Sequence, residues 1–147
     1  METSRADTRV AFIDELTKVS RKLRTAFDAQ VKARELTMAR ARTLLRLLRH
    51  DGMTQTELAV ELEIEGPTLV RLLDNLEAHR LIERCPVKGD RRAKRVALTE
   101  EGRVQAGIVS RLADDVRETV LADVAEDDLQ TAIRVFHAMS RNIEAIA

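Results

Sequence analysis

The sequence is poor in the residues on which several classes of protein depend. Among 147 residues it has no tryptophan, no tyrosine, three phenylalanines and one cysteine. A single cysteine cannot form an internal disulfide, which fits a reducing cytoplasm. A membrane-spanning helix needs a run of about 18 apolar residues, and no run in this sequence approaches that length. The N-terminal stretch METSRADTR also lacks the apolar core of a secretion signal. We therefore expect a cytoplasmic protein without a membrane segment.

A catalytic constellation is also missing. No two of the three histidines, His50, His79 and His137, have the spacing of metal ligands. The glycines do not form a phosphate-binding loop, and no serine has the neighbours of an activated nucleophile. None of the phenylalanines interleaves with the basic residues of segment 80–95, which argues against stacking of single-stranded nucleic acid. We expect neither an enzyme nor a bound metal or cofactor.

Charge is unevenly distributed although it sums to zero. Lysine and arginine together number 25, as do aspartate and glutamate. Residues 80–95 carry a net charge of +5, whereas residues 100–147 carry −5. Arginine supplies 20 of the 25 positive charges, and its guanidinium group suits phosphate and guanine better than an ammonium group does. This segregation of charge allows the protein to present a basic face to nucleic acid. A chain of this length is expected to form one domain.

Two short helices are predicted in the middle of the chain. Thr54 and Glu57 have the spacing of a capping box, and the following apolar residues fall on one helical face. The second helix begins at Gly66-Pro67, because proline in a first turn has no N–H to lose. Its buried face is predicted to consist of Leu69, Leu72, Leu73 and Leu76. Pro67, Thr68 and Arg71 then point elsewhere, which suits insertion into a major groove.

A basic hairpin is predicted after these helices. Residues 82–87 and 95–98 are strand candidates, and residues 88–94 (KGDRRAK) form the loop between them. Gly89 permits the turn, and Pro86 indicates an edge strand. A basic loop beside a groove-sized helix can contact phosphates or insert an arginine into the minor groove. Two helices followed by such a hairpin are typical of a winged helix-turn-helix.

The chain resembles the MarR family of bacterial transcription regulators, and within it the SlyA-type branch. The similarity is carried by residues 64–71 (IEGPTLVR), 76–77 (LE), 81–84 (LIER), 90–95 (DRRAKR) and 98–102 (LTEEG). The family's D-x-R wing pattern falls on Asp90 and Arg92, and its L-T-x-x-G exit falls on Leu98, Thr99 and Gly102. The resemblance implies a mainly α fold with a small β-hairpin wing: a winged helix-turn-helix plus N- and C-terminal dimerisation helices.

Apolar stripes with helical spacing lie on both sides of this segment. One runs from Phe12 to Phe27, a second from Val104 to Val116 and a third from Leu129 to Ile146. Such stripes serve either an intrachain core or a second copy of the chain, and the resemblance favours the second copy. It implies an N-terminal dimerisation helix (1–34), a DNA-binding region (35–99) and C-terminal dimerisation helices (100–147) within one compact domain.

The resemblance implies a homodimer on double-stranded DNA. A two-fold dimer sets two recognition helices about 34 Å apart and therefore reads a pseudo-palindromic operator. Ten residues are predicted to contact the DNA: Thr54, Gln55, Thr56, Pro67, Thr68, Arg71, Asp90, Arg91, Arg92 and Lys94. The first three position the phosphate backbone, and the next three read the major groove. We expect Arg92 to enter the minor groove, oriented by a salt bridge from Asp90, while Arg91 and Lys94 bind phosphates.

The resemblance also implies control by a small molecule. A repressor of this kind leaves DNA when an anionic aromatic effector, such as a phenolic carboxylate, binds between the dimer helices and the winged region. Lys18, Arg21 and Arg84 are candidates for its anionic group, with surface or phosphate-facing roles as the alternative. Release follows when the ligand prefers a half-site spacing that B-DNA does not match.

Cys85 leaves a second interpretation open. It lies beside Arg84 and near Lys88, and positive neighbours favour a reactive thiolate, which suits a redox-responsive regulator. Peroxide-sensing relatives have their reactive cysteine in the N-terminal helix, where this chain has none. Strand alternation predicts instead that Cys85 is a small packing residue. A third interpretation is a winged-helix module that contacts proteins and not DNA.

Overall fold

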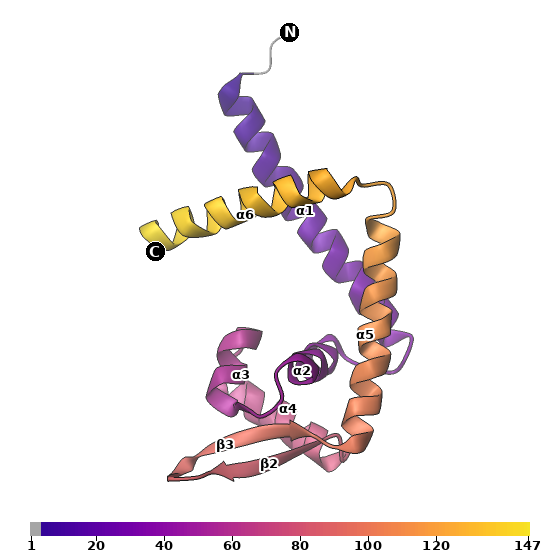
Figure 1. The fold of residues 1–147 in the computed structure, drawn as a ribbon, viewed down its shortest axis with the longest axis vertical. Helices are drawn as coiled ribbons and strands as arrows, with labels where there is room; N and C mark the ends of the chain where they lie inside the picture. Colours follow the sequence, from indigo (N-terminus) through magenta and orange to yellow (C-terminus); the bar gives the residue numbers. More distant parts are fainter. Residues whose placement is uncertain (1–3) are drawn as a thin grey trace. The chain divides into compact units, whose positions relative to one another are not determined.

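The structure, a computed structural model, describes residues 4–147. The elements follow one another as α1 (Arg5–Lys32), α2 (Met38–Arg49), β1 (Met53–Thr54), α3 (Gln55–Leu62), α4 (Gly66–Ala78), β2 (Ile82–Val87), β3 (Asp90–Leu98), α5 (Glu100–Val120) and α6 (Glu126–Ile146). Figure 1 shows the helices and the hairpin of β2 and β3. The predicted mainly α fold with a small β wing is confirmed. The chain divides into two compact units, one ending at Asp114 and one beginning at Asp115.

The strands form one antiparallel sheet in the order β1-β3-β2. Ile82 of β2 pairs with Leu98 of β3, and Met53 of β1 pairs with Val96 of β3. Pro86 therefore lies on an edge strand, as predicted. Strand β1 was not expected from the sequence, because two residues are too few to show an alternating pattern.

The hairpin is longer than the sequence suggested. Strand β3 begins at Asp90, not at residue 95, because Val87 pairs with Asp90 across a turn of only two residues, Lys88 and Gly89. Gly89 has a φ of +88°, which glycine adopts without strain. The backbone hydrogen bonds of the hairpin form although the charged side chains at its tip extend into solvent and bury no apolar surface. Arg91, Arg92 and Lys94 therefore stand on a strand, and only Lys88 of the predicted basic loop lies in the turn.

The main core lies among α2, α3, α4 and the sheet. Leu44, Leu58, Leu69, Leu73 and Leu76 are almost completely buried in it. The predicted buried face of α4 is confirmed, although Leu72 is only half-buried. A second cluster of Val31, Ala41, Val109 and Leu112 joins the end of α1 to α2 and α5.

The turn between α3 and α4 is short and well defined. Glu63 takes a left-handed conformation with φ of 54°, and the N–H of Ile64 donates to the carbonyl oxygen of Ala59 over 3.1 Å. At the other end of α4, Arg40 of α2 donates to the side-chain oxygen of Asn75. Helix α4 is thus held at both ends against its neighbours.

The predicted stripes outside the winged region do form helices, but much of their apolar surface is exposed. On α1 the exposed large apolar residues are Val10, Phe12, Ile13, Val19 and Leu23. In the second unit, α6 has no buried residue, and Ile133, Phe136 and Ile143 are among its exposed side chains. Apolar as these faces are, no helix within residues 4–147 is both long and apolar enough to span a membrane.

Candidate nucleic-acid interface

The start of α3 is fixed by the capping box that the sequence predicted. The Thr54 hydroxyl accepts from the N–H of Glu57 over 3.1 Å, and the Glu57 carboxylate accepts from the N–H of Thr54 over 3.4 Å. Gln55 and Thr56 follow in the first helical turn, where N–H groups are free of intrahelical partners. This turn suits an anionic partner, because the helix dipole adds positive potential there.

The first turns of α4 present the predicted reading residues to solvent. Pro67, Thr68 and Arg71 are all exposed, while Leu69 between them is buried. Proline occupies the second helical position, and Glu65 precedes the helix without a side-chain cap. Within the described residues, the Arg71 guanidinium has no hydrogen bond or ion pair. Its donors are therefore available to a base or a phosphate.

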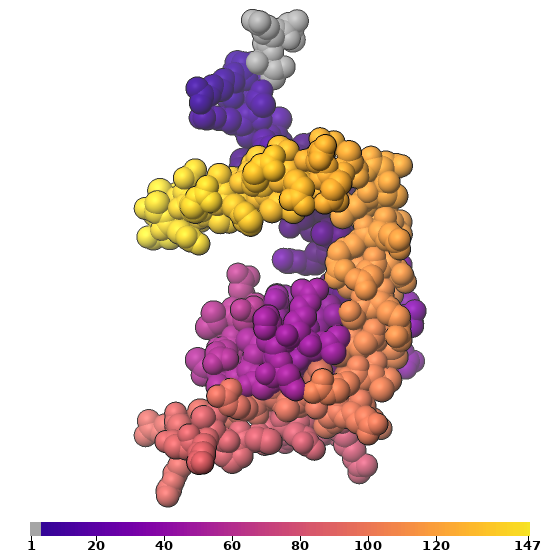
Figure 2. Space-filling model, in the orientation of Figure 1, coloured from indigo at the N-terminus to yellow at the C-terminus, as the bar shows by residue number. Residues whose placement is uncertain are grey.

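The hairpin of β2 and β3 carries the second group of predicted residues. Figure 2 shows this hairpin extending from the α2–α4 region of its own unit. Asp90, Arg91, Arg92 and Lys94 are all exposed on β3. The pairing passes from Val87↔Asp90 to Pro86↔Lys94, so residues 91–93 form a bulge without partners on β2. A bulge re-aims side chains, and here it presents both arginines outward.

The role expected of Asp90 needs correction. Its carboxylate oxygen accepts from the backbone N–H of Arg92 over 2.9 Å, and it forms no ion pair with the Arg92 guanidinium. An aspartate in a turn commonly bonds the backbone two residues on, and this local bond is favoured over holding a long exposed side chain. Asp90 therefore shapes the bulge, and within residues 4–147 the Arg92 guanidinium has no hydrogen bond or ion pair.

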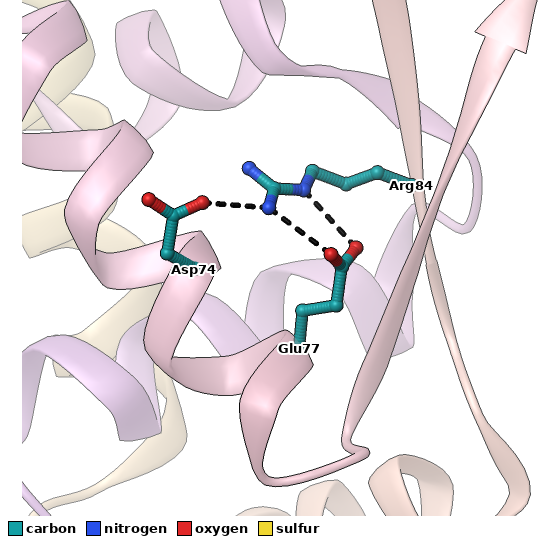
Figure 3. Close-up of polar contacts among 3 residues, drawn as sticks. All are labelled: Asp74, Glu77 and Arg84. Atoms are coloured by element: carbon teal, nitrogen blue, oxygen red, sulfur yellow. Dashed lines mark hydrogen bonds and ion pairs between the residues drawn. The ribbon is translucent and has the colours of Figure 1, made fainter.

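Arg84 joins the hairpin to α4. Figure 3 shows its guanidinium between two carboxylates of α4. Nη2 lies 2.6 Å from Asp74 Oδ1, while Nε and Nη2 lie 3.1 and 3.2 Å from the two oxygens of Glu77. The Arg84 side chain is 19% exposed. The hydrogen bond from Arg84 lowers the pKa of Glu77, and the same bond raises the pKa of Arg84 above its ordinary value.

The three candidate effector residues are not brought together by contacts. Lys18 lies on α1 and pairs with Glu15 over 3.1 Å, and Arg21 is exposed on the same helix. Arg84 lies on β2 and is already bound by two carboxylates. No hydrogen bond or ion pair among the described residues connects any two of the three.

Cys85 is exposed, so the prediction of a packing residue was wrong. Alternation along β2 places Ile82 and Arg84 toward the helices and leaves Cys85 on the outer face, opposite Arg95 of β3. Side chains of β2 do alternate between two faces, but the covered face is the one that carries Arg84, because Arg84 contacts α4.

The connection from the hairpin to α5 contains two hydrogen bonds and a close backbone contact that the sequence did not predict. The Thr99 hydroxyl donates to the carbonyl oxygen of Arg80 over 2.6 Å and accepts from the N–H of Gly102 over 3.0 Å. A Cβ atom on Gly102 would collide with the carbonyl oxygen of Leu81 and lie 2.9 Å from its carbonyl carbon. The L-T-x-x-G pattern is therefore a close-contact joint between the hairpin base and α5.

Comparison with known proteins agrees with this geometry. A sequence model of the MarR family matches residues 35–93. The chain is 38% identical to transcriptional regulator PA3341, whose crystal structure it matches with a TM-score of 0.82 over 91% of this chain and 98% of that one. It is 25% identical to Staphylococcus aureus MepR in its DNA complex, with a TM-score of 0.77 over 90% and 97% of the two chains. A MarR family regulator from Listeria monocytogenes, complexed with 26mer DNA, shares the fold at 21% identity, with a TM-score of 0.77 over 89% and 87%.

Proposed function

The chain belongs to the MarR family of transcriptional regulators, and we propose that it acts in the cytoplasm as a homodimeric repressor on a pseudo-palindromic DNA operator. The family consists of DNA-binding regulators and not of enzymes. We further propose the SlyA-type branch within it, on the wing sequence DRRAKR and the exit LTEEG.

One observation carries the DNA-binding proposal: basic side chains without a partner among the described residues stand on α4 and on the hairpin, and these two parts are tied to each other. Arg71 lies on α4, and Arg91, Arg92 and Lys94 lie on β3. Arg84 of β2, the other strand of the hairpin, is tied to α4 through Asp74 and Glu77. In this proposal Pro67, Thr68 and Arg71 read base edges in the major groove. Arg92 enters the minor groove, where a narrow groove concentrates negative potential. Thr54, Gln55, Thr56, Arg91 and Lys94 contact the phosphate backbone, and Asp90 holds the bulge.

The dimer proposal rests on the exposed apolar faces. Helix α6 buries no residue within the protomer, and α1 exposes Phe12 and Leu23 among other apolar side chains. A second copy of the chain covers both faces in an isologous interface, in which each surface meets its own counterpart. Such an interface is apolar in character, like those of obligate dimers.

The effector proposal follows from the pairing of Arg84. We propose an anionic aromatic ligand whose charged group contacts Lys18, Arg21 or Arg84. An anion that takes Arg84 displaces the carboxylates of Asp74 and Glu77, and this releases the hairpin from α4. The ligand then binds the released state, in which hairpin and α4 are oriented separately, more tightly than the tied state. The protein's affinity for DNA falls by as much as the ligand's affinities for these two states differ.

The test is selection of bound fragments from genomic DNA with the purified protein. The salt concentration is about 150 mM, close to the physiological ionic strength, because affinity for DNA depends on it. We expect an enriched inverted repeat with half-sites about one helical turn apart, bound by two copies of the chain in sedimentation analysis. A folded protein that enriches no sequence would overturn the proposal and favour a winged-helix module that contacts proteins. A binding species containing one copy would overturn the dimer alone.

The exposure of Cys85 favours a second candidate, a redox-responsive regulator. In this alternative, oxidation of the Cys85 thiol on the hairpin changes DNA binding. Peroxide should then lower operator affinity of the native protein and leave Cys85→Ser unaffected. A Cys85→Ser protein that still responds to peroxide removes this candidate.

A further inference from the structure

An apolar hollow lies between α3 and α4. Its volume is about 430 Å³, and its walls include Ala59 and Val60 of α3 and Gly66 and Val70 of α4. Two of these apolar side chains are open to solvent: Val60 is 74% exposed and Val70 is 40% exposed. Single exposed valines are ordinary, but these two border the same hollow.

The hollow lies where the proposed DNA contacts are. Gln55 and Thr56, in the first turn of α3, also line it. On α4, Val70 is one helical turn from Pro67, and residues three apart are neighbours on a helix surface. Val70 is also the residue immediately before Arg71. The apolar surface is therefore continuous with the residues proposed to enter the major groove.

The chemistry of the major groove identifies the partner for this surface. Base edges there present hydrogen-bond donors and acceptors, and the only apolar group is the C5 methyl of thymine. Valine is stiff at χ1, so its methyl groups are already held in place before DNA binds. A polar base edge against Val70 would instead lose water without gaining a hydrogen bond.

We infer that Val70, with Val60 as the opposite wall, forms a seat for the 5-methyl group of a thymine, so that the protein reads an A·T pair at this position of each half-site. This inference rests on the proposed DNA-binding function. It adds a specificity residue to the ten predicted contacts, and it identifies the base that this residue recognises.

The experiment replaces thymine by deoxyuridine, one position at a time, in the operator found by fragment selection. Uracil pairs as thymine does and lacks only the methyl group. We expect roughly fourfold weaker binding at one position in each half-site, the effect of exposing one buried methyl. Val70→Ala should bind thymine and uracil operators equally at that position. Val104→Ala, at a valine of α5 that is 60% exposed, is the matched control and should keep the difference.

The possible failures are distinguishable. If the native protein binds every uracil-substituted operator as tightly as the thymine operator, the inference is overturned while DNA binding stands. If Val70→Ala keeps the full preference for thymine, the methyl group contacts another residue and the inference is again overturned. If no duplex is bound by the folded protein, the proposed function itself fails and this inference fails with it. Circular dichroism of each variant establishes that it is folded.

Discussion

Arg84 and Glu77 form a two-point contact between the hairpin and α4, with Nε and Nη2 of the guanidinium 3.1 and 3.2 Å from the two carboxylate oxygens. The flat guanidinium meets a carboxylate in a fixed orientation, which adds geometric specificity to the attraction. The contact therefore sets the angle between two elements that are proposed to meet DNA together.

The first prediction concerns this contact. Arg84→Met and Glu77→Gln should each destabilise the fold, and a double-mutant cycle should give a coupling energy of about 0.5–1 kcal/mol, because the pair is partly exposed. Urea denaturation of the four proteins measures it. Additive effects of the two substitutions would show that the contact contributes nothing to stability.

The second prediction concerns pH. Arg84 holds the pKa of Glu77 below its ordinary value in the folded protein, so the unfolded chain binds more protons as the solution is acidified. The stabilisation is complete above the unfolded pKa and is lost as pH falls through the folded one. Between about pH 6 and about pH 3, the native protein should lose more stability than Arg84→Met does. Denaturant titrations across this range make the comparison, and parallel pH profiles would contradict it.

The third prediction concerns the wing. Arg92→Ala should weaken operator binding by about 1–3 kcal/mol, whereas Lys94→Ala should weaken binding to all sequences and reduce the salt slope by about one. Fluorescence anisotropy at several salt concentrations separates the two effects. Arg111→Ala, an exposed arginine of α5, controls for loss of charge. If Arg92→Ala binds every duplex as the native protein does, the role assigned to the wing is wrong.

The fourth prediction concerns Arg71. Its unpaired guanidinium on the exposed start of α4 is proposed to reach a base edge, so Arg71→Ala should alter sequence preference as well as affinity. Repeated fragment selection with the variant measures the change at each operator position. An unchanged consensus with lower affinity would assign Arg71 to a phosphate instead.

The fifth prediction compares two glycines of α5. Gly102→Ala should destabilise the fold by about 1–3 kcal/mol, because its Cβ meets the backbone of Leu81. Gly107→Ala has open space around the new Cβ and should stabilise the helix by about 0.5–1 kcal/mol. Thermal and urea denaturation of both variants would show opposite signs. Equal effects would mean that the joint at Gly102 relaxes easily.

Local patterns predicted the winged region well because its signals lie within a few residues. The capping box of Thr54 and Glu57, the buried leucines of α4 and the edge position of Pro86 were all readable from spacing. Contacts between distant elements were not readable. Nothing in the sequence shows that Asp74 and Glu77, one turn apart on α4, face Arg84 of β2.

The differences between the predictions and the structure have a similar cause. The face of β2 occupied by Cys85 depends on which side of the strand α4 covers, and alternation alone does not determine that. The early start of β3 depends on a turn of two residues, whereas the cluster of charged residues suggested a longer loop. The requirement for glycine at position 102 arises from the carbonyl group of Leu81, which lies 21 positions away in the chain.

The joint at Thr99 also determines where related chains can differ in length. Only this residue separates Leu98 of β3 from Glu100 of α5, and its hydroxyl joins Arg80, just before β2, to Gly102 of α5. One inserted residue would turn every following side chain of α5 by about 100° and misplace Gly102. Homologues should therefore tolerate insertions at the Lys88-Gly89 tip and exclude them at the joint, so the wing can change in length during evolution while its base cannot.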